Sequence, residues 1–390
     1  MSVLRGIRVL DLTSQVSGPI CSMLLGDMGA DVIKIEKPRT GDRTRNYPIL
    51  GPALFAPYNR NKRSVTLNLS SHEGREILLR MVKSSHVFLE NFRPGVTEKL
   101  KIDYENVKKV NPKIIYCSVT GFGHTGPYRD RPAWDQVLQA MSGLMSVTGE
   151  PGGRPLRVGT SIVDIITGIY ASYAVAIALI AAIRDGIGQK IDVSLLDAAV
   201  STVSYWIAHY SYTGKIPEKL GSGHPIFAPY EVFKVRDGYV FIGVTDNKFW
   251  SGFCDILGVG DLAADDRFMT NERRVENKEE LMSLLREVIA GWDGDDLLEK
   301  LVGAGIPCAP VNTIDRVMND PHLLKRGAIV EVQYPPDRRV KVSGIPVKFS
   351  KTPGSIRSDP PSLGQDTEDV LKEFGYSGKD LSQLRARGVI

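Results

Sequence analysis

Apolar and polar positions in the first part of the chain alternate between the period of a strand and the period of a helix. The pattern predicts a buried strand at Ile7–Leu12, a helix at Ile20–Met28 and a second strand at Asp31–Glu36. The alternation continues, with strands predicted at 64–69, 87–90, 114–119 and 190–194 and helices at 73–82, 104–110 and 195–210. Such alternation predicts an α/β fold with a doubly wound, largely parallel, Rossmann-like sheet.

The pattern changes after the glycine-rich run Gly221-Ser222-Gly223-His224. Tyr230–Val235 and Tyr239–Val244 flank Arg236-Asp237-Gly238 as the strands of a hairpin would. Helices are predicted at 249–257, 278–290, 313–318 and 367–374, and strands at 329–332 and 340–347. We therefore expect a large domain of residues 1–215 and 330–390, a small α+β domain of residues 225–325, and linkers at 211–228 and 310–345.

One segment, Ile165–Ile183, carries no charge and approaches the length that spans a bilayer. It is rich in Ala, Gly, Ser, Thr and Tyr, and no second segment of this kind exists. These features favour a helix buried at the centre of a soluble core over a membrane span.

Composition narrows the functional classes. The 49 basic and 45 acidic residues are scattered, so no basic block for nucleic acid is present. The four cysteines show no C-x-x-C pairing and are expected to be reduced. With no apolar leader at the N-terminus, a cytoplasmic location and no membrane association are expected.

Several common cofactor and catalytic motifs do not occur. The first turn after Leu12 has a single glycine, Gly18, where a dinucleotide fingerprint needs three, and no P-loop motif is found. No pair among the six histidines has a metal-ligand spacing, and no G-x-S-x-G elbow is present. We expect no metal and no tightly bound cofactor.

Six short runs occur in a fixed order: Leu4-Arg5-Gly6-Ile7-Arg8-Val9-Leu10-Asp11-Leu12, Gly29-Ala30-Asp31-Val32-Ile33-Lys34-Ile35-Glu36, Asn61-Lys62-Arg63-Ser64, Glu90-Asn91-Phe92-Arg93-Pro94-Gly95, Gly121-Phe122-Gly123 with Gly126-Pro127, and Asp192-Val193-Ser194-Leu195-Leu196-Asp197. Together they resemble the family III coenzyme A transferases, which include the formyl-CoA and crotonobetainyl-CoA transferases and the related α-methylacyl-CoA racemases. The resemblance implies a homodimer of interlocked subunits that acts on acyl-CoA and carboxylic acids.

The resemblance places the family's nucleophilic aspartate at Asp164, at the start of the apolar segment. It implies that Asp164 attacks an acyl-CoA thioester to form an anhydride and then an aspartyl-CoA thioester. We expect the helix dipole and free amides to hold this carboxylate ionised. An aspartate here could also simply cap the helix.

The same resemblance implies contacts for coenzyme A at Lys37, Leu67, Asn68, Leu69, Ser70, Asn91, Phe92, Arg93, Lys99, Thr120, Gly121, Phe122 and Gly123. Lys62 and Arg63 are further candidates for phosphate binding. Gln15, Val16 and Trp134 are expected at the substrate, and the run Gly221-Ser222-Gly223-His224 corresponds to the loop that shields the intermediates.

Three functional classes remain open: a CoA-transferase, an acyl-CoA racemase and a non-catalytic relative. Trp134 stands where the racemase base would be, and an indole cannot accept a proton; His124 lies ten residues earlier. Val16, Thr120 and Phe122 depart from the pattern of the formyl-CoA type. A different acid is therefore expected, such as a dicarboxylate held by Arg39, Arg45 or Arg131, with succinyl-CoA as a candidate donor.

Overall fold

The structure is a computed structural model that describes residues 2–48 and 50–390. It divides into two compact units, which are described separately. The first contains the chain up to Leu144 together with Arg157–Ala208 and Asp320–Ile390, and the second contains Met145–Leu156 and His209–Asn319. Met145–Leu156 belongs to the second unit, where the Gly221 amide donates to the Gly149 carbonyl at 2.9 Å.

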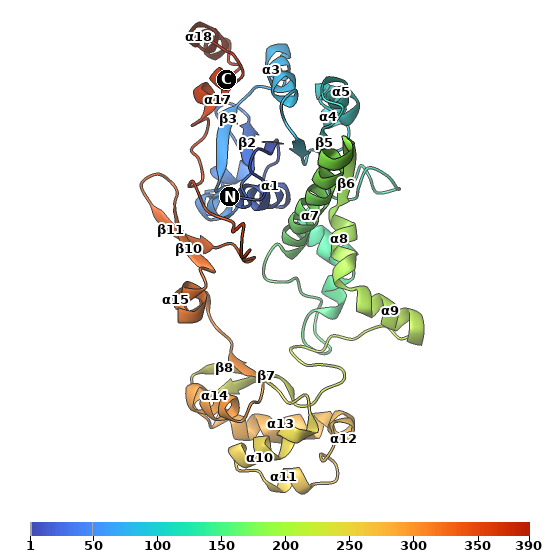
Figure 1. The fold of residues 1–390 in the computed structure, drawn as a ribbon. Helices are drawn as coiled ribbons and strands as arrows, with labels where there is room; N and C mark the ends of the chain where they lie inside the picture. Colours follow the sequence, from blue (N-terminus) through green and yellow to red (C-terminus); the bar gives the residue numbers. More distant parts are fainter. Residues whose placement is uncertain (1, 49) are drawn as a thin grey trace. The chain divides into compact units, whose positions relative to one another are not determined.

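The first unit is built on a six-stranded parallel sheet with the order β3-β2-β1-β4-β5-β6 (Figure 1). The strands are β1 Arg8–Asp11, β2 Asp31–Glu36, β3 Lys62–Thr66, β4 Val87–Glu90, β5 Ile115–Thr120 and β6 Gln189–Ser194. In register, Leu10 of β1 lies between Ile33 of β2 and Phe88 of β4. The predicted parallel, doubly wound sheet is confirmed. Its strand order reverses between β1 and β4, where such sheets bind ligands beyond the carboxyl ends of the strands.

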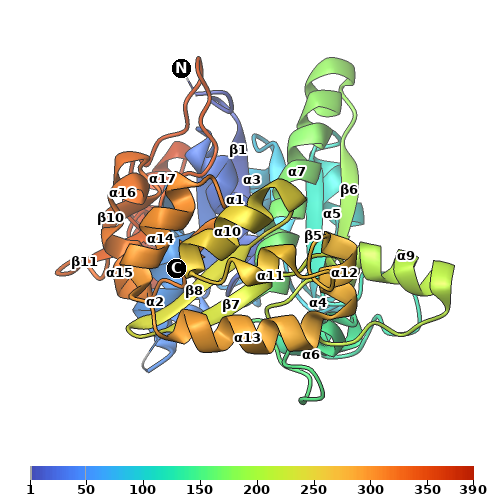
Figure 2. The ribbon, with the colours of Figure 1, turned by 90° about the horizontal axis from the view of Figure 1, so that it is seen from below.

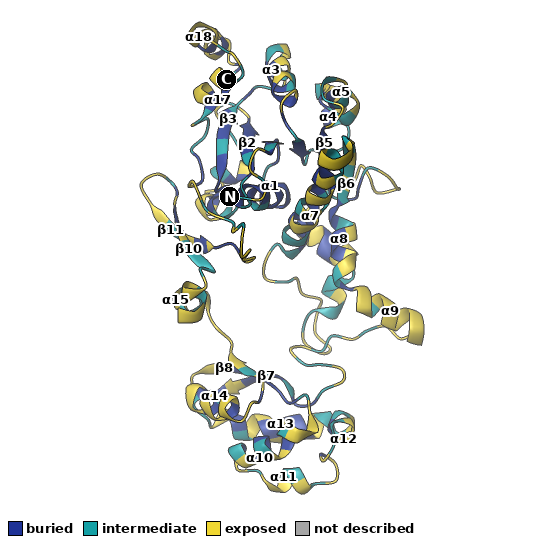
Figure 3. Cartoon of the chain, viewed as in Figure 1, coloured by how far each residue is buried: buried dark blue, intermediate teal, exposed yellow. Residues whose placement is uncertain are grey.

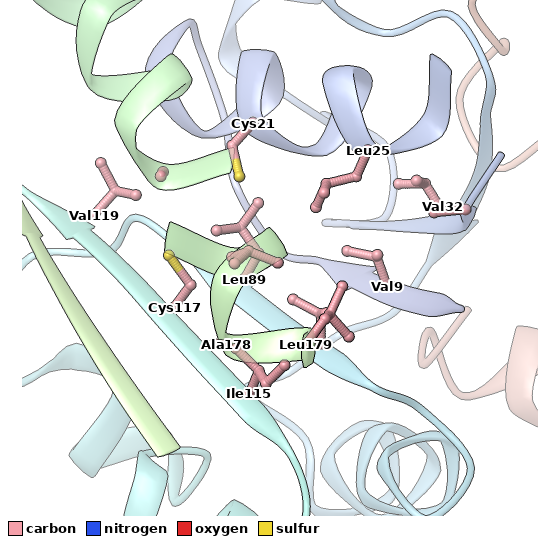
Figure 4. Packing of buried hydrophobic residues seen from close by; sticks show 14 of the residues in the cluster. Val9, Cys21, Leu25, Val32, Leu89, Ile115, Cys117, Val119, Ala178 and Leu179 are labelled. Atoms are coloured by element: carbon pink, nitrogen blue, oxygen red, sulfur yellow. The ribbon is translucent and has the colours of Figure 1, made fainter. Parts of the chain in front are cut away.

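Helices cover both faces of the sheet (Figures 1 and 2). Alternate residues of β1 point to opposite faces, with Val9 in one apolar cluster and Leu10 in the other. The first cluster includes α1 Ser17–Asp27, α7 Ile162–Asp185 and α8 Leu195–Thr202. The second includes α3 His72–Val82, α5 Tyr104–Val110, α17 Thr367–Glu373 and α18 Gly378–Ala386. Figure 4 shows Leu25 of α1 and Leu179 of α7 gathered with Val9 and Leu89 in the first cluster.

The long helix α7 is only partly buried, which corrects the expectation of a central core helix. Ala171, Val175 and Leu179 pack against the sheet. Tyr173 is 63% and Ile183 is 70% exposed. Figure 3 shows exposed positions in yellow along α7. In the described residues, α7 is the one helix that is long and apolar enough to cross a membrane. The core helix of a soluble protein can meet the same criterion. Packing on the sheet accounts for the apolar side chains on one face of α7, and the exposed isoleucines and tyrosines on the rest of the helix are not covered within the described residues.

Shorter elements complete the first unit. They are η1 Arg43–Asn46, α2 Gly51–Phe55, η2 Ala56–Tyr58, α4 Val96–Leu100, α6 Asp135–Met141, α16 Pro321–Lys325, β10 Ile329–Gln333 and β11 Arg339–Ser343. The helix predicted at 195–210 is divided at Val203 into α8 and α9 Ser204–Thr213. η3 Leu144–Val147 and α9 lie at the boundaries between the units.

The second unit contains the predicted hairpin. β7 Tyr230–Val235 pairs antiparallel with β8 Gly238–Gly243, and β9 Cys308–Pro310 pairs with the other edge of β8. Its helices are η4 Asn247–Phe249, α10 Trp250–Leu257, α11 Asp261–Ala264, α12 Asn271–Glu276, α13 Lys278–Ala290, α14 Gly294–Gly303 and α15 Ile314–Asn319. Phe233, Ile242, Phe253 and Leu285 lie in the apolar core of this unit.

Candidate active site at the carboxyl ends of the parallel strands

The turn that follows β1 is held by buried charges. Lys34 Nζ lies 3.0 Å from Asp42 Oδ2 and donates to the Thr13 carbonyl at 2.8 Å. Asp42 in turn accepts a hydrogen bond from the Gln15 amide at 3.1 Å. Gln15 has a φ of 73°, a left-handed backbone conformation that is unfavourable for residues other than glycine. The Lys34–Asp42 pair therefore fixes a strained turn directly before α1.

A second buried pair lies under this turn. Lys62 Nζ lies 3.1 Å from Asp11 Oδ2, and both side chains are fully buried. Burial alone would raise the pKa of Asp11, but Lys62, Lys34 and two hydroxyls lower it to about 2. Burial lowers the pKa of Lys62 to about 8. The hypothesis that Lys62 binds a phosphate is wrong, because its ammonium group is enclosed and paired.

Asp164 lies in the first turn of α7 and lines a cavity beyond the carboxyl ends of β4 and β5. Residues from five other segments also line this cavity, including Gln15, Ser17, Asn91, Phe92, Arg93, Thr120, Gly121, Arg129, Arg131, Trp134, Asp135 and Leu195. The structure thus brings Asp164 together with Gln15 and Trp134. Val16, by contrast, is buried as the N-cap residue of α1.

The ionisation of Asp164 differs from the expectation. Burial, followed by the neighbouring charge of Asp135, raises the pKa of Asp164 to about 7, and a hydrogen bond from the Ser17 side chain partly offsets the rise. The backbone amides of Val163 and Asp164 donate to Asp135 Oδ2 at 2.8 and 3.2 Å. The helix amides therefore serve a second carboxylate, and the expectation that they hold Asp164 ionised is wrong.

A second cavity lies beyond the carboxyl ends of β1, β2 and β3. Lys37, Arg43, the segment 67–70 and Phe92 line it, and Phe92 also lines the cavity of Asp164. Leu67 is buried, so its side chain belongs to the core. These residues include six of the predicted contacts for coenzyme A, brought together from strands that are separate in the sequence.

The other predicted contacts are placed differently. Asn91 locks the turn, since its Nδ2 donates to the Ser14 carbonyl at 2.9 Å and its Oδ1 accepts from the Ser14 amide at 3.0 Å. Lys99 is exposed on α4. Phe122 is buried in the first apolar cluster, and the Gly123 amide donates to Thr120 Oγ1 at 3.0 Å.

The arginines proposed from the sequence are separated by the fold. Arg45 pairs with buried Glu36 at 2.7 Å and stacks over Phe55, so it is not available to a substrate, which corrects that prediction. Arg63 pairs with Asp31 at 2.8 Å and also with Glu373. Arg39 lines a third hollow with Lys37 and Arg385. Only Arg131 of the three dicarboxylate candidates lines the cavity of Asp164.

His124, the remaining candidate for a racemase base, is held by Ser118 and Asp192. Its Nε2 lies 2.7 Å from Ser118 Oγ, and its backbone amide donates to Asp192 Oδ2 at 2.8 Å. Burial, followed by the charge of Lys190, lowers its pKa. His124 is not among the residues that line the cavity of Asp164.

The glycine-rich run belongs to the second unit. Ser222 Oγ accepts a hydrogen bond from the Val232 amide at 2.9 Å, and Lys278 Nζ donates to the His224 carbonyl at 3.3 Å. The His224 ring packs against Phe227 and Tyr230 at centroid distances of 5.0 and 5.1 Å. Gly221 has a φ of 59°, which favours glycine at this position.

Sequence reasoning missed two neighbours of Asp164. Asp135 supplies the acceptor for the first amides of α7, and Tyr58 has a pKa raised by burial and by the charge of Asp164. The i, i+4 spacing of Asp135 and Gln139 was the available signal for a polar pair on one helix face. Across residues 2–48 and 50–390, no cluster of three metal-ligating side chains is found.

Comparison with known proteins identifies the family. The model of CoA-transferase family III matches residues 4–367. The chain is 39% identical to a succinate–glutarate CoA-transferase of Agrobacterium fabrum, covering 95% of each chain, and 36% identical to a human succinyl-CoA:glutarate CoA-transferase, covering 99% of this chain and 90% of the other. The crystal structure of a CaiB/BaiF family protein from Brucella suis superposes with a TM-score of 0.88 at 38% identity, over 96% of this chain and 99% of that one. The chain belongs to CoA-transferase family III and is a transferase, as the six sequence runs predicted.

Proposed function

We propose that this enzyme transfers coenzyme A from a donor acyl-CoA to an acceptor carboxylic acid through covalent intermediates on Asp164. The observation that carries the proposal is the position of this carboxylate. It lies half-buried at the start of α7 and lines a cavity at the carboxyl ends of the parallel strands, with a pKa raised to about 7 by burial and by Asp135. A partly desolvated carboxylate of this basicity is a suitable nucleophile near neutral pH.

The chemistry consists of two acyl transfers and their reversal. An oxygen of Asp164 attacks the thioester carbonyl, the C–S bond breaks, CoA leaves as a thiolate, and the acyl group stays on Asp164 as a mixed anhydride. The thiolate then attacks the aspartyl carbonyl and releases the donor acid as a carboxylate. The acceptor acid repeats both steps in the reverse order, so no net proton is consumed and the thioester bond is conserved.

Two neighbouring cavities provide a route for coenzyme A. Lys37 and the segment 67–70 line one cavity, Arg93 and Thr120–Gly121 line the other, and Phe92 lines both. We assign the nucleotide to the first cavity and the thioester end to the second, with Lys99 near the phosphates. Arginine and lysine side chains suit phosphate groups, and the Phe92 ring can flank the adenine or pantetheine.

The acid is proposed to be a dicarboxylate, with succinyl-CoA as the donor. Arg129 and Arg131 line the cavity of Asp164, and Arg131 lies over the Tyr128 ring at 4.0 Å. Stacking restricts the guanidinium, so less entropy is lost when it binds a carboxylate in two hydrogen bonds. The named succinate, glutarate and mesaconate transferases among the relatives support this class of substrate.

We further propose that two copies associate through α7. We also propose that the run 221–224 shields the covalent intermediates from water and that the enzyme works in the cytoplasm. The large apolar side chains exposed along α7 are Ile169, Tyr170, Tyr173, Ile177, Ile180 and Ile183. Contiguous apolar surface of this kind marks an interface. A homodimer would bury it without a membrane.

Intact-protein mass spectrometry after incubation with succinyl-CoA tests the nucleophile. A CoA adduct, with hydroxylamine trapping at Asp164, is expected in the native enzyme and absent from Asp164→Asn. An adduct on the variant would refute the assignment. No adduct with a panel of acyl-CoAs, together with deuterium exchange at the α-carbon, would instead favour the racemase, which Trp134 disfavours.

A further inference from the structure

Two buried side chains of α6 hold the start of α7. Asp135 Oδ2 accepts the amides of Val163 and Asp164, and its other oxygen, Oδ1, accepts from Gln139 Nε2 at 2.6 Å. Gln139 Oε1 accepts from the Val158 amide at 2.9 Å. Asp135 is 3% exposed and Gln139 is fully buried. The pair therefore brackets the backbone from Val158 to Asp164.

The bracket replaces a local helix cap. The first amides of an α-helix have no partner within the helix, and a side chain just before it commonly accepts one of them. Ser161, the N-cap residue of α7, makes no such bond. A carboxylate from another helix makes two, and this fixes the backbone that carries Asp164.

The same bond has an electrostatic consequence for Asp164. The amides that could stabilise an ionised side chain in the first turn are occupied, and a second negative charge lies beside it. Both effects favour the protonated form of Asp164, and once deprotonated such a carboxylate is more basic and a stronger nucleophile. The contact with Asp135 therefore sets both the basicity of the Asp164 carboxylate and the orientation of its backbone.

We propose that Asp135, held by Gln139, is a positioning residue that orients the backbone of Asp164 and keeps its carboxylate basic. This inference rests on the proposed nucleophilic role of Asp164.

Other titratable or charged groups also face this carboxylate. Tyr58 comes from η2, Arg93 from the segment after β4, and Arg129 and Arg131 from the segment after β5. The hydroxyl of Ser17 comes from α1. All five side chains remain in place when only Asp135 or Gln139 is substituted. A change in the titration of Asp164 therefore reports the effect of the Asp135–Gln139 pair.

The test uses the pH dependence of CoA-adduct formation at Asp164 in three variants. Asp135→Asn keeps an oxygen for the helix amides but removes the charge. The double variant Asp135→Asn with Gln139→Glu can keep the hydrogen bond between the two side chains with donor and acceptor exchanged. It also returns the negative charge one helical turn away. Asp130→Asn removes the same charge from an exposed carboxylate on the segment before α6, whose ion pair is with exposed Arg129 at 3.6 Å.

For Asp135→Asn, we expect the acid limb to move to lower pH by about one unit and the plateau rate above it to fall. The double variant should lie between this variant and the native enzyme, and Asp130→Asn should match the native enzyme. A folded Asp135→Asn with an unmoved limb would overturn the role of Asp135. If that variant does not fold, an unmoved limb in the double variant overturns it. Absence of any adduct in the native enzyme would overturn the nucleophile itself, which is a separate result.

Discussion

Replacing Asp164 by asparagine should stabilise the fold in a pH-dependent way. The carboxyl group has an ordinary pKa of 3.8 and a pKa of about 7 in the folded chain, because burial and Asp135 oppose its charge. Between these values the folded state holds a proton that the unfolded state has lost. Stability therefore falls as pH rises from about 4 to about 7 and is constant above that.

The shift sets the size of the effect. About three pKa units correspond to an upper limit of about 4 kcal/mol, and solvent at the open cavity reduces it, so roughly 2 kcal/mol is a realistic expectation. Asparagine has the same shape and no charge, so it removes this cost. Asp164→Asn should therefore raise the midpoint of thermal unfolding by roughly 2–3 °C at pH 8.

The assay is thermal unfolding of the native enzyme and Asp164→Asn at pH 4.5 and pH 8, at one protein concentration because the proposed dimer links the midpoint to concentration. The gain should be present at pH 8 and small at pH 4.5. Asp130→Asn, which is exposed, serves as the control for a lost surface charge. An equal gain at both pH values, or no gain at pH 8, would refute the raised pKa.

Two further predictions concern the substrate and the interface. Arg131→Gln should raise the KM for a dicarboxylate acceptor by roughly tenfold or more and leave a monocarboxylate of similar length unaffected, as measured by initial rates; equal losses for both acids would contradict a role in binding the second carboxylate. Ile180→Glu should convert the proposed dimer to monomer in sedimentation velocity, because it places a charge on the apolar face of α7. Lys372→Glu on α17 serves as its control. An unchanged dimer in Ile180→Glu would rule out α7 as the interface.

The raised pKa of Asp164 illustrates a conflict between stability and function. A buried carboxylate next to a second carboxylate is costly for the fold, and such costs concentrate at active sites. Three other buried carboxylates are each paired with a cation: Asp11 with Lys62, Asp42 with Lys34 and Glu36 with Arg45. Asp164, like buried Glu90, is by contrast a carboxylate whose ionised form is disfavoured.

The order and type of the central elements followed from sequence pattern alone. β2, β4, β7, α5 and α13 have the predicted bounds, because a strand buried on both faces or a helix with one apolar stripe repeats its pattern within the segment. α18 and α6 were missed, and α18 is largely polar, so it carries only a weak apolar stripe. The family also followed from the sequence, through runs that lie mostly on strands and turns of the sheet, and the same resemblance gave Asp164 as the proposed nucleophile.

The tertiary structure alone decided which charges are available and how Asp164 ionises. Lys62, Arg45 and Arg131 are alike in sequence, yet the first two are buried in ion pairs and the third lines the cavity. Asp135 lies far from Asp164 along the chain, but packing of α6 against α7 brings its carboxylate to the first amides of α7. Burial and partner geometry set the ionisation of a side chain, and both depend on segments that meet only when the chain folds.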